Sequence, residues 1–239
     1  MKKAMVFVAL LLGTAVFGAI VFGGAAWFAR GSSSAGVSQP GAGPVAQPAT
    51  VAAPSENDGE AQLSGADSLS DFRLADFEFT DHTGQAVDHR IFDGEVTALA
   101  FFFTSCPGPC PVMIANMIDV QSRTAGSGLR FAAISVDGSR DTPEVLAAYA
   151  QRVGIDIERW RLMTGEPELV SKLAFDSLSY EIRTQPDFLV DGPDGRPMAN
   201  ILHPTRVLLI GPDRRLIGTY RYSSRDEMDR LIADATAEG

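Results

Sequence analysis

The sequence predicts a three-layer α/β domain, in which helices cover a central sheet. Two apolar runs of strand length, residues 96–103 and 129–137, are typical of strands buried on both faces. A helical pattern follows each run, over residues 111–123 and 142–154. Strands and helices that alternate in this way form a sheet flanked by helices.

The remaining elements fit the same plan. The helix over residues 142–154 has Thr142 as its N-cap, Pro143 at its first position and Gly154 at its end. Pro111 opens the helix over 111–123, because a first turn tolerates proline. Four further segments complete the domain: extended pieces around a Thr83-Gly84 turn within 77–88, a helix over 166–178, a hairpin over 205–211 and 215–222, and an amphipathic helix over 223–239.

The first 30 residues predict a transmembrane anchor. Ala4 to Ala29 carry no charge, and a helix of that length rises about 39 Å, enough to cross a hydrocarbon core of about 30 Å. A cleavable signal peptide has a shorter apolar core of about 7–15 residues, so a long signal peptide cleaved near GGAAWFA is the minor alternative. Lys2 and Lys3 keep the start of the chain cytoplasmic, so the rest is expected on the periplasmic or outer face of the inner membrane.

Residues 31–70 predict a flexible linker, since they are rich in Gly, Ser, Ala and Pro and have few large apolar side chains. The globular domain then occupies residues 71–239. The formal net charge of the chain is −10, which excludes nucleic acid as a partner because phosphate binding needs a basic surface.

Both cysteines of the chain, Cys106 and Cys110, lie in FFFTSCPGPCPVM, between a predicted strand and a predicted helix. A helix N-terminus stabilises anions, so a thiol here should be more acidic than usual, and the thiolate is both nucleophile and metal ligand. The spacing permits a metal chelate or a reversible disulfide. A permanent structural disulfide is the weaker interpretation, because a loop this small gains little from closure.

Three segments resemble the Sco/SenC family of copper-handling assembly factors: FFFTSCPGPCPVM, ISVDGSRDTPEVLAAYA and ILHPTRVLLIGPDRRLIG. The segment FEFTDHTGQAV also resembles the N-terminal β-hairpin that this family adds to its fold, and the anchor and linker match its usual architecture. The resemblance covers about Leu74 to the C-terminus.

The resemblance implies a thioredoxin-like fold that binds one copper ion, Cu(I) or Cu(II), through Cys106, Cys110 and His203. It also implies that Cys106 and Cys110 are a redox pair. The family serves the copper-A centre of cytochrome c oxidase, as metal donor, as reductant of its cysteines, or both. The client of this chain is therefore expected to be the copper-A subunit of cytochrome c oxidase or another copper enzyme.

Other candidate residues have plainer explanations. His82 and His89 are expected at the surface, and Met113 and Met117 in the core, so none of them is a predicted ligand. A structural zinc site would need a fourth ligand, which the sequence does not offer. Residues 137–141, with Asp137, Arg140 and Asp141, predict a salt-bridged turn before a helix, with partner docking as the alternative.

Other functions remain open. Pro204, directly after His203, resembles the proline that faces the active site of thioredoxin-type oxidoreductases, which supports a metal-independent exported thiol–disulfide oxidoreductase. A peroxiredoxin would need a proline ahead of Cys106, within residues 98–104, where there is none. A pure interaction module would function without either thiol.

Overall fold

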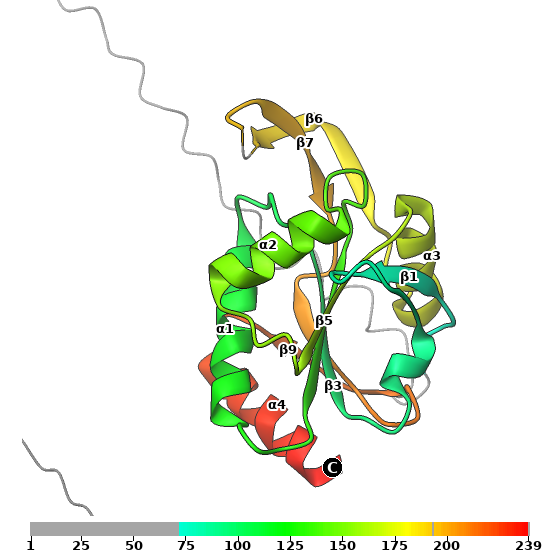
Figure 1. The fold of residues 1–239 in the computed structure, drawn as a ribbon, viewed down its shortest axis with the longest axis vertical. Helices are drawn as coiled ribbons and strands as arrows, with labels where there is room; N and C mark the ends of the chain where they lie inside the picture. Colours follow the sequence, from blue (N-terminus) through cyan, green and yellow to red (C-terminus); the bar gives the residue numbers. More distant parts are fainter. Residues whose placement is uncertain (1–71, 193, 239) are drawn as a thin grey trace, which may run out of the picture. The chain divides into compact units, whose positions relative to one another are not determined.

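The computed structural model describes residues 72–192 and 194–238 (Figure 1). The predicted anchor and linker, residues 1–30 and 31–70, lie outside the described residues. Within the part that is described, no helix combines the length and the apolar character needed to cross a membrane.

Seven strands form one sheet in the order β2-β1-β5-β4-β3-β8-β9. The three central strands β3, β4 and β5 run parallel, whereas β1, β8 and β9 pair antiparallel with their neighbours. The bounds are β1 Glu78–Asp81, β2 Ala86–Asp88, β3 Thr97–Phe102, β4 Arg130–Ser135, β5 Trp160–Thr164, β8 Arg206–Ile210 and β9 Leu216–Arg221. The β1–β2 pair is the predicted N-terminal hairpin, and Gly84 supplies the left-handed residue of its turn, at φ 81°.

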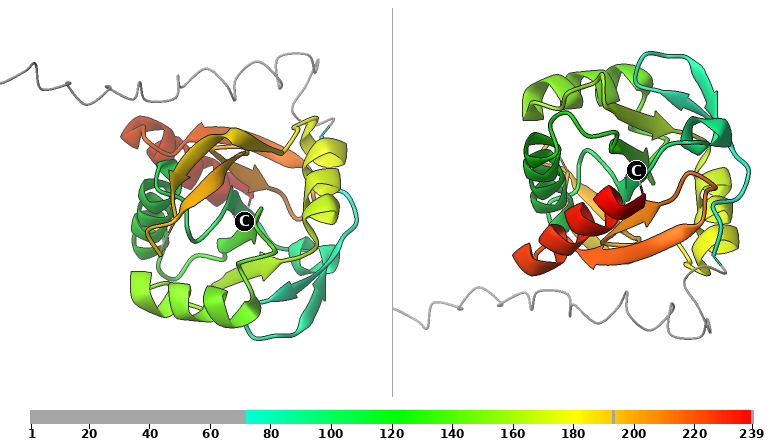
Figure 2. Two further views of the ribbon diagram at one scale, coloured as in Figure 1. Left: turned by 90° about the horizontal axis from the view of Figure 1, so that it is seen from above. Right: turned by 90° about the horizontal axis from the view of Figure 1, so that it is seen from below.

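Helices cover both faces of this sheet (Figures 1 and 2). The crossovers β3–α1–β4 and β4–α2–β5 progress along the sheet in the same direction, so right-handed connections place α1 and α2 on the same face. Helix α4 joins them there and contacts α1, while α3 covers the opposite face. Their bounds are α1 Pro109–Arg123, α2 Pro143–Val153, α3 Pro167–Leu178 and α4 Arg225–Glu238, and a short 3-10 helix, η2, spans His89–Phe92.

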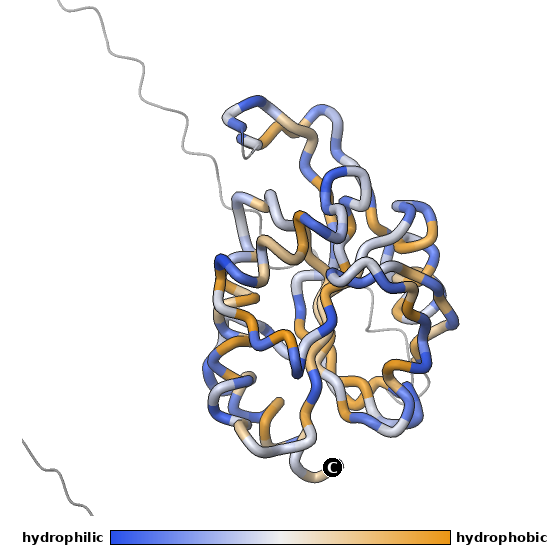
Figure 3. The backbone as a smooth tube through the Cα atoms, viewed as in Figure 1, coloured by the Kyte–Doolittle hydropathy of each residue, from blue (hydrophilic) through white to orange (hydrophobic). Residues whose placement is uncertain are grey.

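The central strand β3 is buried along its whole length, as its unbroken apolar run predicts. Figure 3 shows apolar residues concentrated on the central strands. The core also holds Trp160 of β5, which stacks on Phe131 of β4 with 5.1 Å between ring centroids. This rigid centre fixes the point where β3 ends and the cysteine-bearing segment begins.

Three strands were not predicted from the sequence: β5 and the pair β6 (Arg183–Asp191) and β7 (Pro197–Leu202). The last two form a separate two-stranded sheet, drawn at the top of Figure 1. Their register shifts between Gln185 and Leu189, and most of β6 is exposed. This hairpin matters for function because β7 ends directly before His203.

Candidate metal centre

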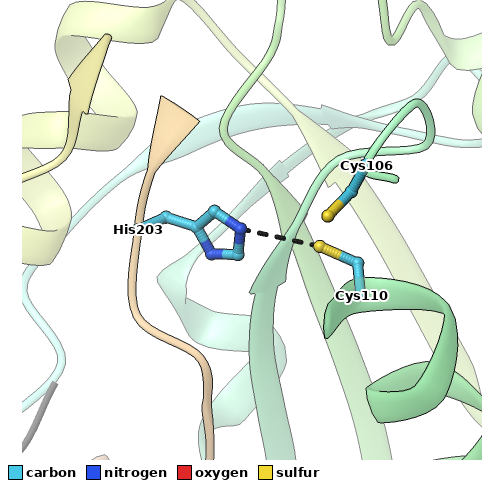
Figure 4. Close-up of side chains that lie close together, drawn as sticks. All are labelled: Cys106, Cys110 and His203. Carbon is cyan, nitrogen blue, oxygen red and sulfur yellow. Dashed lines mark hydrogen bonds between the residues drawn. The ribbon is translucent and has the colours of Figure 1, made fainter. Parts of the chain in front are cut away.

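Cys106, Cys110 and His203 come together at one end of the sheet (Figure 4). One potential ligand atom from each residue lies within 4.8 Å of the other two, and Cys110 Sγ is 3.5 Å from His203 Nε2. All three residues are buried. In the described part of the chain, no other group of three or more His, Cys, Asp and Glu residues is arranged to hold a metal ion.

The two cysteines are positioned by the junction between β3 and α1. After β3 ends at Phe102, the amide of Cys106 donates a hydrogen bond to the Phe103 carbonyl, 3.2 Å away. Helix α1 then begins at Pro109, two residues earlier than predicted, so Cys110 lies in its first turn. Pro109 and Pro111 both fit there because the first amides of a helix have no partner within it. Both cysteines are free thiols.

His203 reaches the cysteines from the segment between β7 and β8. Its Nδ1 lies 2.8 Å from the carbonyl oxygen of Pro204, which can only accept, so the ring proton is on Nδ1. The lone pair of Nε2 is therefore directed toward Cys110. Phe103 packs against the imidazole in an edge-to-face arrangement, with 5.6 Å between ring centroids. A histidine whose second nitrogen donates to a backbone carbonyl is oriented as metal-binding histidines are.

The two thiols differ in acidity. The pKa of Cys106 is lowered, first because the Cys110 thiol donates a hydrogen bond to its sulfur and further because the backbone amides of Cys110 and Gly108 also donate to it. Burial raises the pKa of Cys110 well above its ordinary value, and the neighbouring Cys106 sulfur adds to this effect. The expectation of an acidic thiol therefore holds for Cys106 and is wrong for Cys110, where desolvation outweighs the helix N-terminus.

This donor set fits one copper ion. Thiolates favour Cu(I), while imidazole also serves Cu(II), so two sulfurs and one nitrogen suit both oxidation states. A structural zinc site would take four protein ligands, and the group in the described residues has three. The ring orientation of His203 adds a second, independent sign of fit.

The other candidates lie elsewhere. The prediction for His82 is wrong: it is buried, with 6% of its surface exposed, and its amide donates to the Leu162 carbonyl. His89 is partly exposed and lies 3.5 Å from the Asp76 carboxylate. Met113 and Met117 are core residues, as predicted.

The predicted salt-bridged turn is present, because Arg140 Nε lies 2.5 Å from Asp137 Oδ2. Asp141 is not part of this ion pair, which corrects the prediction. It is fully buried and accepts hydrogen bonds from Thr104 and Ser135 instead.

Comparison with known proteins decides the family. The sequence profile of the SCO1/SenC family matches residues 67–237. The chain belongs to the SCO1/SenC family. A SCO1 protein homolog of Bacillus subtilis is 26% identical over 166 residues, which covers 68% of this chain and 81% of that protein. The human mitochondrial SCO1 homolog is 29% identical over 154 residues but only 48% of its length is covered.

Solved structures of SCO1/SenC proteins share the fold. BsSco is described as a member of the Sco family of cytochrome c oxidase assembly proteins in which a disulfide switch has been identified. Its structure is 26% identical in sequence, with a TM-score of 0.59. The match covers 72% of this chain and 96% of BsSco. ScoI of Bradyrhizobium japonicum with copper bound is 21% identical with a TM-score of 0.53, covering 70% of this chain and 99% of ScoI. The predicted thioredoxin-like fold is thus confirmed.

Proposed function

We propose that this chain is a membrane-anchored metallochaperone that binds one copper ion through Cys106, Cys110 and His203. The observation that carries the proposal is the orientation of His203, whose Nε2 lone pair faces a buried pair of free thiols. The chemistry of the donors supports copper as the cargo. Two relatives of the same fold, from Bradyrhizobium japonicum and Arabidopsis thaliana, are described with copper bound.

The proposed client is the copper-A subunit of cytochrome c oxidase, or another copper enzyme. Support comes from BsSco, whose family is described as assembling cytochrome c oxidase. The uncharged N-terminal stretch would anchor the chain in the inner membrane, with the folded domain on the periplasmic side. A tether of about 40 residues would hold that domain at a high effective concentration near a membrane-bound client.

The different acidities of the thiols suggest an order of events during metal uptake. Cys106 offers the first thiolate because its pKa is lowered. Cys110 keeps its proton until the metal arrives, and the positive charge of the ion then favours release of that proton. His203 would bind the metal through Nε2, because its Nδ1 is held by the Pro204 carbonyl.

A second candidate is a metal-independent thiol–disulfide oxidoreductase, favoured by the unequal pair of free thiols. In that reaction the Cys106 thiolate attacks a client disulfide and releases one client thiolate. Cys110 then attacks the mixed disulfide, which leaves Cys106 and Cys110 joined and both client sulfurs reduced, a transfer of two electrons. Such a step could prepare the cysteines of a copper-A site for metal.

Copper titration separates the two functions. We expect the reduced full-length chain to bind one equivalent of copper anaerobically, and the chain oxidised at Cys106 and Cys110 to bind none, because a disulfide lacks thiolate ligands. Cys106→Ser and Cys110→Ser should each lose tight binding. If the reduced chain binds no copper yet reduces a disulfide peptide, the oxidoreductase function replaces the chaperone function. Full copper retention by the oxidised chain would contradict the assignment of Cys106 and Cys110 as the copper ligands.

A further inference from the structure

Asp141 joins three parts of the domain through one buried carboxylate. It lies between β4 and α2, directly before the N-cap Thr142, and none of its surface is exposed. Its Oδ2 accepts hydrogen bonds from the Thr104 amide at 2.9 Å and the Ser135 hydroxyl at 2.6 Å. Its Oδ1 accepts from the Thr104 hydroxyl at 2.6 Å. A buried carboxylate needs such partners, since an unpaired one is costly.

Thr104 stands two residues before Cys106, in the turn that leaves β3. The hydrogen bonds to its amide and hydroxyl hold this turn against the end of β4, where Ser135 pairs with Phe102. On the other side of Cys106, Gly108 provides no side-chain cap for α1, and the backbone amides of Gly108 and Cys110 donate to the Cys106 sulfur instead. Asp141 is thus the side chain that fixes where the Cys106 segment departs from the sheet.

We propose that Asp141 is a positioning residue for the dithiol. By fixing Thr104, it keeps the Cys106 sulfur within reach of Cys110 and His203, without itself touching the metal or the sulfurs. The inference rests on the proposed function where copper affinity is the readout. It extends to the dithiol chemistry, because the same turn sets the separation of the two sulfurs.

The competing explanation is that Asp141 only stabilises the fold, and Asp81 provides a matched control. Asp81 is also a buried carboxylate, 3% exposed, and it too accepts from the amide and hydroxyl of one threonine, Thr83, at 2.8 and 2.6 Å. Its third partner is the Gln85 amide at 3.2 Å. These hydrogen bonds are local to the turn between β1 and β2. Asp81 Oδ2 also lies 3.9 Å from Arg161 Nε of β5, and none of these groups belongs to the metal centre.

The test compares Asp141→Ala, Asp141→Asn and Asp81→Ala in the reduced full-length chain. Cu(I) affinity is measured by anaerobic competition with a chromophoric chelator, and the dithiol reduction potential by equilibration with glutathione. Urea unfolding gives the stability of each variant. We expect Asp141→Ala to weaken copper binding by about 10- to 100-fold, the usual cost of removing a group that orients metal ligands. Asp81→Ala should lose stability with unchanged affinity and potential.

Asp141→Asn should recover most of the affinity. Its amide oxygen can accept from the Thr104 amide and the Ser135 hydroxyl, while its amide nitrogen donates to the Thr104 hydroxyl in place of Oδ1. Thr104→Val loses only the hydroxyl contact, so it should weaken copper binding less than Asp141→Ala. It replaces Asp141→Ala as the test variant if Asp141→Ala does not fold.

The two readouts separate failure of this inference from failure of the proposed function. If the unaltered chain binds no copper, the chaperone function fails, and a shifted reduction potential in Asp141→Ala alone would still support the positioning role. The positioning role is overturned if Asp141→Ala matches Asp81→Ala in both copper affinity and reduction potential. If Asp141→Ala does not fold, the role is overturned when Thr104→Val matches the unaltered chain in both measurements.

Discussion

Replacing His203 by alanine should abolish most of the stabilisation that copper gives to the domain. The change removes one of three donors, and it also removes the N–H that Nδ1 donates to the Pro204 carbonyl. A buried carbonyl left without its donor costs about 1–3 kcal/mol in any state of the protein. The copper-dependent loss must therefore be measured as a difference between copper-loaded and copper-free protein.

The size of that difference follows from linkage. At a free copper concentration of 100 times Kd, binding stabilises the folded state by about 2.7 kcal/mol, which raises Tm by about 5–10 °C for a domain of this size. If losing one donor weakens affinity about 100-fold, the same copper concentration only equals Kd. The stabilisation then falls to about 0.4 kcal/mol, and the rise in Tm to about 1–2 °C.

The assay is anaerobic thermal unfolding with and without Cu(I), with His82→Ala as the control. His82 and His203 are buried to nearly the same extent, 6% and 4% exposed, but only His203 lies in the metal centre. Both variants should be less stable than the unaltered chain without copper, and His82→Ala should keep the full copper-induced rise. A full rise in His203→Ala, or its loss in both variants, would refute the assignment.

Three further outcomes are expected. Gly138→Ala should destabilise the fold by at least about 1–3 kcal/mol in urea unfolding, because its Cβ would lie 1.9 Å from the Gly165 carbonyl oxygen, and an unchanged midpoint would count against this packing. Iodoacetamide should modify Cys106 before Cys110. As pH decreases, the rate at Cys106 should begin to fall only at a lower pH than the rate of an ordinary thiol, because its lowered pKa keeps the thiolate. Peptide mapping across pH measures both rates, and faster modification of Cys110 would contradict this prediction. Asp229→Asn breaks the partly exposed ion pair between α4 and Arg123 of α1, and it should lower the free energy of unfolding by less than about 1 kcal/mol in the same urea measurement. A larger loss would contradict the treatment of this pair as an ordinary surface ion pair.

The layers of the fold could be predicted because their signals are local. The unbroken apolar run of β3 and the N-cap Thr142 of α2 each encode an element within a few residues. The β6–β7 hairpin was missed because Pro186 and Pro197 weaken the strand signal and most of β6 is exposed. A turn signal, DGPDG around Gly195, was available between the two strands.

The candidate site was predictable in part. The spacing of Cys106 and Cys110 indicated a chelate or a redox pair, whereas the choice of His203 depended mainly on family resemblance. Asp141 was misjudged because its main partner, Thr104, is 37 residues away, and no local spacing reports such a contact. His82 was misplaced for a similar reason, since pairing with β5 buries it and the polar turn around it does not reveal this.

Because of the positions of the three donors along the chain, the metal-bound site and the oxidised site cross-link the polypeptide differently. Cys110 and His203 are 93 residues apart, so an ion shared between them would cross-link distant parts of the polypeptide. A bond between Cys106 and Cys110 closes only a short loop. By loop-closure entropy, the long link raises the free energy of the unfolded chain by about 3 kcal/mol more than the short one. Resistance to unfolding would therefore report whether the site holds metal or has been oxidised.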